Sequence, residues 1–512
     1  MAQAGSLALL LVGASLFGVA TRVAFPPAAW IGIAALVHGS RSMRPLLGVP
    51  LLWLALYVSL GVARRDTLPV PGPIFMGIFA VEATIMTLPF VVDRIVFPRI
   101  GGVAATLVFP MALVAAEFLR SRFTPAASWG SIAYSQYGFM PLMQVAAVAG
   151  IWGITFVVAW FASTFELAWS RSFSWTEIRG PVLTYGVALV AILFVGCVRL
   201  MAAPTDRATI RTATLNRPID LFAPGEMTRI SEGRVSASER EPFKVKLSRL
   251  HDWFLEGSRR EARAGARLIV WPEQNLLVFD DDEAAFLERA RRLAADERVY
   301  LAMGMGTIHL GDRLPFENKL VLIDPSGQIV MSHLKNRPVA GWEANIMRRG
   351  HDGIPVVATD AGRMAAPICF EADFPDFIRQ AGQNDADLLI LPVNDWKSIK
   401  NIHFQMHVFR AIENGVPLVR AAASGLSVAI DPWGRVLSMS DFYAAGDRTM
   451  TAQLPMGRIP TLYARSGDWF SWLCVAGLAA MLSVVMIGTA QRAMVQSPPG
   501  VQKARLAVHS ER

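Results

Sequence analysis

Three side chains of complementary chemistry follow predicted β-strands in the C-terminal half of this 512-residue chain. Glu273 comes directly after the apolar run Leu268–Trp271 and one proline, and Lys335 ends a second strand. Cys369 follows a third strand, Met364–Ile368. Because the carboxyl ends of neighbouring strands meet at one edge of a sheet, we expect a carboxylate, an ammonium group and a thiol to lie together.

These residue types suit catalysis by a cysteine nucleophile. A free thiol has a pKa of ~8.5, so at neutral pH it is mostly protonated and needs a base or a nearby cation before it reacts. Glu273 can accept the proton, and Lys335 can stabilise first the thiolate and then the oxyanion of a tetrahedral intermediate. This chemistry requires no metal or other cofactor.

Each of the three residues also has an ordinary structural interpretation. Cys369 can be a small buried apolar residue, Glu273 a surface turn residue and Lys335 a solvated cation. The other two cysteines of the chain, Cys197 and Cys474, lie inside apolar segments. Three cysteines so placed build neither a disulfide framework nor a zinc cluster.

Two histidines offer a competing reading of the chemistry. His403 and His407 are four residues apart on a predicted helix, a spacing that can bind zinc. No glutamate stands between them in the metalloprotease position, and no third ligand is evident, so we expect a structural pair. A cysteine protease that paired Cys369 with either histidine would leave Glu273 and Lys335 unexplained.

The elements that must position these residues lie in a region with the composition of a soluble domain, residues 205–465. Phe243–Ala264 is predicted to be an amphipathic helix, and Asp282–Asp296 a helix that begins in an acidic run. Turns at Asp324–Gly327 and Asp431–Gly434 predict hairpins. Strands alternating with helices indicate an α/β layered domain with a mixed sheet. The predicted strands are Leu268–Trp271, Val299–Met303, Lys319–Ile323, Gln328–His333, Met364–Ile368, Leu388–Pro392, Pro417–Ala421 and Leu426–Ile430.

The rest of the chain is far more apolar. With 53% hydrophobic and only 18% charged residues, the chain is no single soluble domain. We expect about seven transmembrane helices in 1–204, a further helix in 466–490 and a tail in 491–512. The apolar segments are 6–20, 28–38, 46–62, 74–92, 103–119, 143–168, 181–202 and 468–489.

Arginine distribution predicts the orientation of these helices. With the N-terminus in the cytoplasm, the cytoplasmic loops hold more basic residues than the opposite loops, and an odd number of spans then places 205–465 outside the cytoplasm. The net charge of +8 lies largely in such loops, next to lipid head groups, so we expect no nucleic-acid partner. The basic residues on the cytoplasmic side are Arg41, Arg44, Arg94, Arg99, Arg171, Arg179, Arg492, Lys503 and Arg505.

Several motifs resemble a known family. The order Glu273, Lys335, Cys369 on strand ends resembles the carbon–nitrogen hydrolase (nitrilase) superfamily. With helices before and after this domain, the chain is similar to the bacterial apolipoprotein N-acyltransferases. The motifs that carry the resemblance are Trp271–Glu273, Ile368–Glu371, Asn394–Trp396, His403–Met406, Arg410–Gly415 and Tyr463–Trp469.

The resemblance implies a fold and an activity. The fold would be a multi-pass α-helical membrane domain plus a nitrilase-like α-β-β-α sandwich on the periplasmic side of the inner membrane. Glu273 would be the general base, Lys335 the oxyanion stabiliser and Cys369 the nucleophile. Other active-site residues would be Glu343, a supporting carboxylate, Glu371, a carboxylate near the thiol, and Phe370 and Asn394.

The implied reaction moves an acyl chain from a phospholipid, through a cysteine thioester, to the N-terminal amine of a diacylglyceryl-cysteine lipoprotein, without a cofactor. Two stretches depart from the family pattern, Gln274–Leu277 and Asn336–Trp342. They leave open a membrane-anchored amidase or nitrilase-like hydrolase, in which water attacks the thioester. A third interpretation is a domain that has lost catalysis and only binds lipid or lipoprotein. A loop over 339–350 is a candidate lid.

Overall fold

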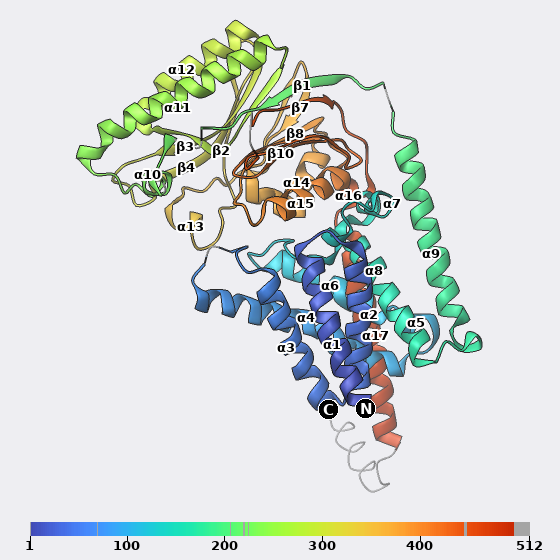
Figure 1. The fold of residues 1–512 in the computed structure, drawn as a ribbon. Coiled ribbons are helices and arrows are strands. Elements are labelled where there is room, and N and C mark those ends of the chain that lie inside the picture. The colour runs from blue at the N-terminus through green and yellow to red at the C-terminus, as the bar shows by residue number, and fades with distance from the viewer. Residues whose placement is uncertain are drawn as a thin grey trace, which may run out of the picture.

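The computed structural model of the protein describes residues 2–68, 70–204, 206–218, 221–223, 225–444 and 448–495. Most of the expected tail, 491–512, lies outside the described residues. Figure 1 shows a helical bundle below and a sheet-rich domain above, with the last helix returning from the domain to the bundle. The fold is therefore the expected combination of a helical membrane part and an α/β part.

The bundle is built from apolar helices, and each of the eight predicted segments forms one. Within the described residues, seven helical stretches are long and apolar enough to cross a membrane. The eighth, α2, has 17 residues and packs against α1 and α8. The helices are α1 (Ala2–Arg22), α2 (Pro26–Ser42), α3 (Pro45–Ala63), α4 (Gly72–Val96), α5 (Gly102–Thr106), α6 (Val108–Phe123), α7 (Met140–Met143), α8 (Ala146–Ser170), α9 (Trp175–Met201) and α17 (Trp469–Val495), with short 3₁₀ helices η1 (Phe97–Arg99) and η2 (Ile132–Gln136).

Ion pairs inside the bundle explain why α2 is longer than expected. The apolar run ends near residue 38, but α2 continues to Ser42. Arg41 donates to Asp93 of α4 at 2.7 Å and also pairs with Glu166 of α8. A buried charge is tolerated only when it is paired, so these partners let a polar turn remain inside the bundle.

The α/β domain contains two six-stranded mixed sheets that pack face to face. Their strand orders are β12-β1-β2-β3-β4-β5 and β11-β10-β9-β8-β7-β6. Strand β2 packs across the interface on β8 and β9. The strands are β1 (Thr209–Thr214), β2 (Leu268–Phe279), β3 (Tyr300–Ile308), β4 (Phe316–Ile323), β5 (Ile329–Leu334), β6 (Val356–Thr359), β7 (Gly362–Ala365), β8 (Leu388–Asn394), β9 (Leu418–Ala423), β10 (Leu426–Ile430), β11 (Val436–Asp441) and β12 (Met450–Pro455).

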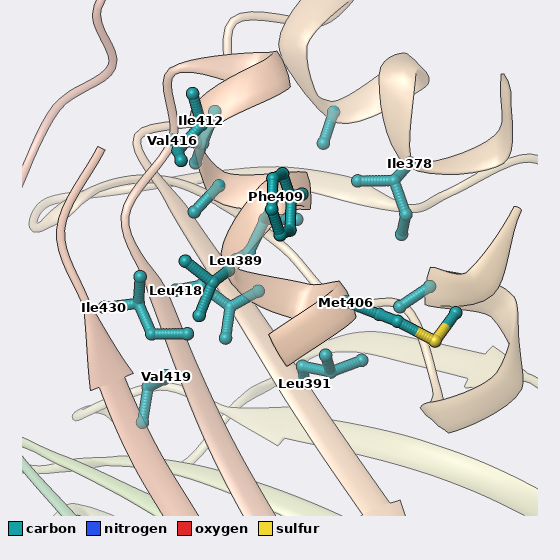
Figure 2. Close-up of a cluster of buried hydrophobic side chains, with 14 of the residues drawn as sticks. Ile378, Leu389, Leu391, Met406, Phe409, Ile412, Val416, Leu418, Val419 and Ile430 are labelled. Atoms are coloured by element: carbon teal, nitrogen blue, oxygen red, sulfur yellow. The ribbon is translucent and has the colours of Figure 1, made fainter. Parts of the chain in front are cut away.

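Helices cover both outer faces of this sandwich, which gives the α-β-β-α order of layers. Helices α11 and α12 cover the first sheet, while α14 and α15 cover the second (Figure 1). Figure 2 shows Phe409 and Ile412 of α15 packed over Leu389 and Leu418 of the second sheet. The helices of the domain are α10 (Glu226–Ser231), α11 (Ala237–Arg263), α12 (Asp280–Glu297), α13 (Glu343–Ile346), η4 (Cys369–Asp373), α14 (Pro375–Gln383), α15 (Lys400–Asn414) and α16 (Leu462–Ser466).

Three local expectations need correction. Helix α11 begins six residues earlier than expected, because the Glu239 carboxylate accepts a hydrogen bond from the Ser236 backbone N–H at 3.0 Å and so caps the first turn. Strand β2 does not stop at Trp271 but continues to Phe279, with its pairing to β3 interrupted after Trp271. Strand β7 ends at Ala365, so three residues separate it from Cys369.

Candidate active site

Lys335 lies at the centre of a buried ionic cluster. Its ammonium group is fully buried and donates to Glu273 Oε1 at 2.7 Å and to Glu343 Oε2 at 2.8 Å. The two carboxylates come from β2 and α13, and Lys335 follows β5 directly. We call Glu273, Lys335, Glu343 and Cys369 the catalytic cluster, after the roles that the family resemblance implies for them.

Three hydrogen-bond donors fix the Glu273 carboxylate, and Lys335 is the first of them. Oε1 also accepts from the Asn318 side chain at 2.6 Å, and Oε2 accepts from the Asn394 backbone N–H at 2.8 Å. The interruption of the β2–β3 pairing after Trp271 contains Glu273, and the next residue, Gln274, has a φ of +53°. A residue in the left-handed region is uncommon outside glycine, and here it turns the carboxylate away from the regular ladder.

Cys369 occupies a tight turn that the surroundings must hold. It is the first residue of η4, is 6% exposed and has a φ of +46°. The Glu371 carboxylate accepts from the backbone N–H groups of Ile368 at 2.7 Å and Asn336 at 2.6 Å, and it lies 3.0 Å from His333 Nε2. Glu371 thus ties the turn of the thiol to the chain on either side of Lys335.

The charged groups of the catalytic cluster shift each other's pKa values. Burial, together with the negative charge of Glu273, raises the pKa of the Cys369 thiol well above its usual value, although Lys335 opposes this. Burial lowers the pKa of Lys335, but the charges of Glu273 and Glu343 outweigh it and raise the pKa well above the usual value. The resting site therefore holds a protonated thiol beside an ammonium group and a carboxylate.

Glu343 is held in place from three sides. Its pKa is raised by burial, which exceeds the opposing effect of Lys335. Oε2 accepts from the Val339 backbone N–H at 2.8 Å, and Oε1 accepts from the Gln274 side chain at 3.2 Å. The stretch that departs from the family pattern at Gln274 thus supports the site itself.

Phe370 and Asn394 lie next to these groups. The Phe370 ring is half-buried and packs edge-on against Phe374, with ring centroids 5.2 Å apart. Asn394 contributes its backbone N–H to Glu273, and it lines a cavity of about 80 Å³ together with Gln274 and Trp342.

The expected histidine pair is part of a second buried cluster, which we call the histidine cluster: Asp373, Asp395, His403, His407 and Arg420. The expectation that the pair has no third ligand nearby is wrong, because Asp373 Oδ1 lies 3.1 Å from His403 Nε2 and 3.6 Å from His407 Nε2.

A metal ion does not fit this second cluster. The Arg420 Nε–H donates to His407 Nδ1 at 2.9 Å. Nδ1 is therefore unprotonated, and the neutral ring carries its proton on Nε2, the atom that would have to bind the metal. A metal-bound His407 would need its proton on Nδ1, facing a donor.

Sequence reasoning missed two residues that contact the catalytic cluster, Asn318 and Gln274. Asn318 and the adjacent Lys319 interrupt the apolar pattern of β4, and such an interruption of a central strand is the signal by which Asn318 could have been found. Gln274 was noted only as the start of a stretch that departs from the family pattern, and its contact with Glu343 depends on a backbone turn.

Residues 234–463 match the carbon-nitrogen hydrolase family, and residues 9–164 match the apolipoprotein N-acyltransferase N-terminal domain. An apolipoprotein N-acyltransferase of Geobacter metallireducens is 28% identical over 92% of this chain and 94% of its own. One of Bradyrhizobium diazoefficiens is 28% identical over 84% and 79%. A solved amidase from Nesterenkonia sp. is 18% identical, covers 52% of this chain and 96% of its own, and has a TM-score of 0.39.

Each family match falls on one structural part: residues 9–164 lie in the helical bundle, and residues 234–463 cover most of the sandwich. With seven long apolar helices in the part of the chain that the structure describes, this is a multi-pass bacterial membrane protein. It belongs to the apolipoprotein N-acyltransferase family, because the N-terminal domain of that family matches its bundle, a carbon-nitrogen hydrolase domain follows, and curated members are similar to it over most of its length.

Proposed function

We propose that this protein transfers an acyl chain from a phospholipid to the N-terminal amine of a diacylglyceryl-cysteine lipoprotein, with Glu273, Lys335 and Cys369 as catalytic residues. The observation that carries the proposal is the buried Lys335 ammonium group between two carboxylates, acting on a cysteine thiol, in a chain with membrane helices on both sides of the domain.

In the first half of the reaction, Glu273 takes the proton from the Cys369 thiol and the thiolate attacks the carbonyl carbon of an acyl ester. A bond forms between Sγ and that carbon, and the carbonyl oxygen becomes an oxyanion. Lys335 stabilises this charge in a dry site, where a fixed cation is most effective. The ester C–O bond then breaks, and the leaving lysophospholipid oxygen receives the proton from Glu273.

In the second half, the amine of the lipoprotein attacks the thioester. Glu273 accepts a proton from the attacking nitrogen, and Lys335 again stabilises the oxyanion. The C–S bond breaks, an amide is released and the proton returns to Cys369. Glu343 keeps Lys335 charged and in position, and Glu371 holds the turn of the nucleophile.

The membrane helices fit lipid substrates. Figure 1 shows α13, which carries Glu343, on the side of the domain that faces the bundle, so substrates held in the bilayer can approach the site from below. The excess of arginine in alternate loops supports a location of the domain outside the cytoplasm, on the periplasmic side of the inner membrane.

Intact mass spectrometry tests the proposal. The full-length protein is incubated with phospholipid, with and without a diacylglyceryl lipopeptide. We expect a mass gain of one acyl chain, which is lost from the protein when the peptide is added and appears on the peptide amine. Cys369→Ala should abolish the gain, whereas Cys197→Ala, on the exposed side of α9, should keep it. Acylation that persists in Cys369→Ala contradicts the proposal, and a thioester that decays in water and ignores the peptide indicates a hydrolase.

A further inference from the structure

The histidine cluster adjoins the turn that carries Cys369 and takes no part in the reaction steps above. Asp373, its first member, is the last residue of η4, the 3₁₀ helix that begins at Cys369. All five members are buried, with Asp395 the most exposed at 5%. Such a set of charges is costly to bury unless every member is paired, so its arrangement is specific.

The imidazole ring of His403 connects the turn that carries Cys369 with the strand end that holds Glu273. His403 Nε2 lies 3.1 Å from Asp373 Oδ1, and His403 Nδ1 lies 2.6 Å from Asp395 Oδ1. Since both ring nitrogens face carboxylates, both carry protons. Asp395 follows Asn394, the residue with the backbone N–H that holds Glu273. The imidazolium of His403 therefore joins the turn of the thiol to the strand end that holds the base.

A loop of the membrane bundle also forms a hydrogen bond with the Asp373 carboxylate. In the loop after α6, the Trp129 indole N–H donates to Asp373 Oδ2 at 2.7 Å. The Ser128 hydroxyl donates to the Asp373 backbone carbonyl at 2.6 Å, and the Ser128 backbone N–H does so at 3.2 Å. Each half of the molecule thus holds one oxygen of the Asp373 carboxylate.

The turn at Cys369 needs such support. Its left-handed φ is unfavourable for a cysteine, and such a conformation persists only when neighbouring contacts enforce it. Two short-range backbone bonds connect η4 with its flanking residues, from the Glu371 N–H to the Ile368 carbonyl at 3.0 Å and from the Phe374 N–H to the Glu371 carbonyl at 3.3 Å. Because catalysis tolerates little displacement of the reacting atom, contacts that fix this turn affect the rate directly.

We propose that Asp373 and His403 are positioning residues that set Cys369 relative to Glu273, and that Trp129 makes this positioning depend on the membrane bundle. This inference rests on the proposed function. Through Trp129, movement of the loop after α6 changes the position of the nucleophile without any contact to the acyl donor.

The test uses Trp129→Phe in the full-length protein, because this change keeps an aromatic ring beside His403 and removes only the N–H donor. Trp53→Phe is the matched control, since it removes an indole hydrogen bond to Thr84 elsewhere in the bundle. Single-turnover acylation is measured at several concentrations of mixed phosphatidylethanolamine and phosphatidylglycerol. We expect Trp129→Phe to lower the rate at saturating donor about tenfold, with an unchanged half-saturating concentration, and Trp53→Phe to leave both unchanged.

A double variant separates positioning from a general loss of stability. Asp373→Asn should lower the saturating rate about a hundredfold, and Trp129→Phe added to it should lower the rate less than twofold further, because both act through one carboxylate. Hydrogen–deuterium exchange should rise over residues 369–374 in Trp129→Phe.

Three kinetic outcomes overturn the inference: an unchanged rate in Trp129→Phe, a full tenfold effect in the Asp373→Asn background, or a change confined to the half-saturating concentration. Wild-type protein that forms no acyl-enzyme refutes the proposed function instead, and the exchange measurement then still decides the positioning by itself. Stoichiometric zinc binding that is lost in His407→Gln also overturns the inference.

Discussion

The two buried ionic clusters of the catalytic domain differ in how their charges balance. In the catalytic cluster, one cation, Lys335, faces the two carboxylates of Glu273 and Glu343. In the histidine cluster, two carboxylates face two cations, His403 and Arg420. The catalytic cluster therefore has more carboxylates than cations, whereas the histidine cluster has equal numbers of both.

The pKa shifts of the two clusters have opposite directions for this reason. In the catalytic cluster, the pKa of Glu343 and that of the Cys369 thiol are raised. In the histidine cluster, burial opposes ionisation of Asp373, but His403 holds the pKa of that carboxyl well below its usual value. A mismatched set keeps a group ready to exchange a proton, while a matched set fixes its members in place.

The largest effect on stability and acylation is expected when Lys335, the central cation of the catalytic cluster, is removed. Lys335→Met leaves two buried carboxylates unpaired, so we expect the free energy of unfolding to fall by roughly 3–5 kcal/mol. Acylation should fall at least a hundredfold, because the oxyanion loses its cation. Denaturant unfolding and the mass-spectrometric assay measure the two effects.

Lys319→Met is the control for this variant. Lys319 pairs with Glu283 at 2.7 Å and Glu317 at 3.0 Å in the same sheet, but these side chains are 11%, 20% and 19% exposed, whereas Lys335 is fully buried. Because Glu283 and Glu317 keep contact with water, we expect a smaller loss of stability than in Lys335→Met, about 1–2 kcal/mol, and acylation should remain at the wild-type rate. Equal losses in both variants would show that the catalytic cluster is an ordinary ion pair.

Much of this architecture was predictable from local patterns. The apolar segments predicted the helices of the bundle, and alternating strands and helices predicted the layered domain. Residues at strand ends predicted that Glu273 and Lys335 would lie together, as the 2.7 Å contact between them shows. In each case the signal was contained within one segment of sequence.

Contacts between distant segments were not predictable in this way. The end of α2 depends on Asp93 and Glu166, 52 and 125 residues away from Arg41. Asp373, the carboxylate that contacts both histidines, lies 30 residues before His403. No periodicity links such partners, because the fold alone brings them together.

The histidine cluster should give an alkaline limit to stability. Burial lowers the pKa of His403, but Asp373 and Asp395 outweigh it and raise the pKa to about 9. Because this value exceeds the unfolded value of about 6.5, the contribution is complete below pH ~6.5 and is lost as the pH rises through about 9. The His403 ring also contacts His407, which is neutral throughout this pH range, and Arg420.

Thermal unfolding between pH 6.5 and 9.5 measures this contribution, which amounts to about 3 kcal/mol over the whole range. In His403→Gln the alkaline loss should be absent, because glutamine does not titrate. A wild-type unfolding temperature that stays constant up to pH 9.5 would mean that His403 is neutral in the folded protein, and the two clusters would then not differ in charge balance.

The smallest effect on acylation should come from the loss of Gln274, which donates a hydrogen bond to Glu343 but is not itself a member of the catalytic cluster. Gln274→Met keeps the length of the side chain and removes the hydrogen bond to Glu343, which retains Lys335 and the Val339 N–H. One hydrogen bond is worth about 1 kcal/mol, so we expect a roughly fivefold slower acylation and a fall of only about 1 kcal/mol in the free energy of unfolding. Gln328→Met, in the exposed turn between β4 and β5, serves as the control. If Gln274→Met were as damaging as Lys335→Met, charge balance would matter less at this site than the exact placement of Glu343, and the contrast between the two clusters would have to be explained by geometry.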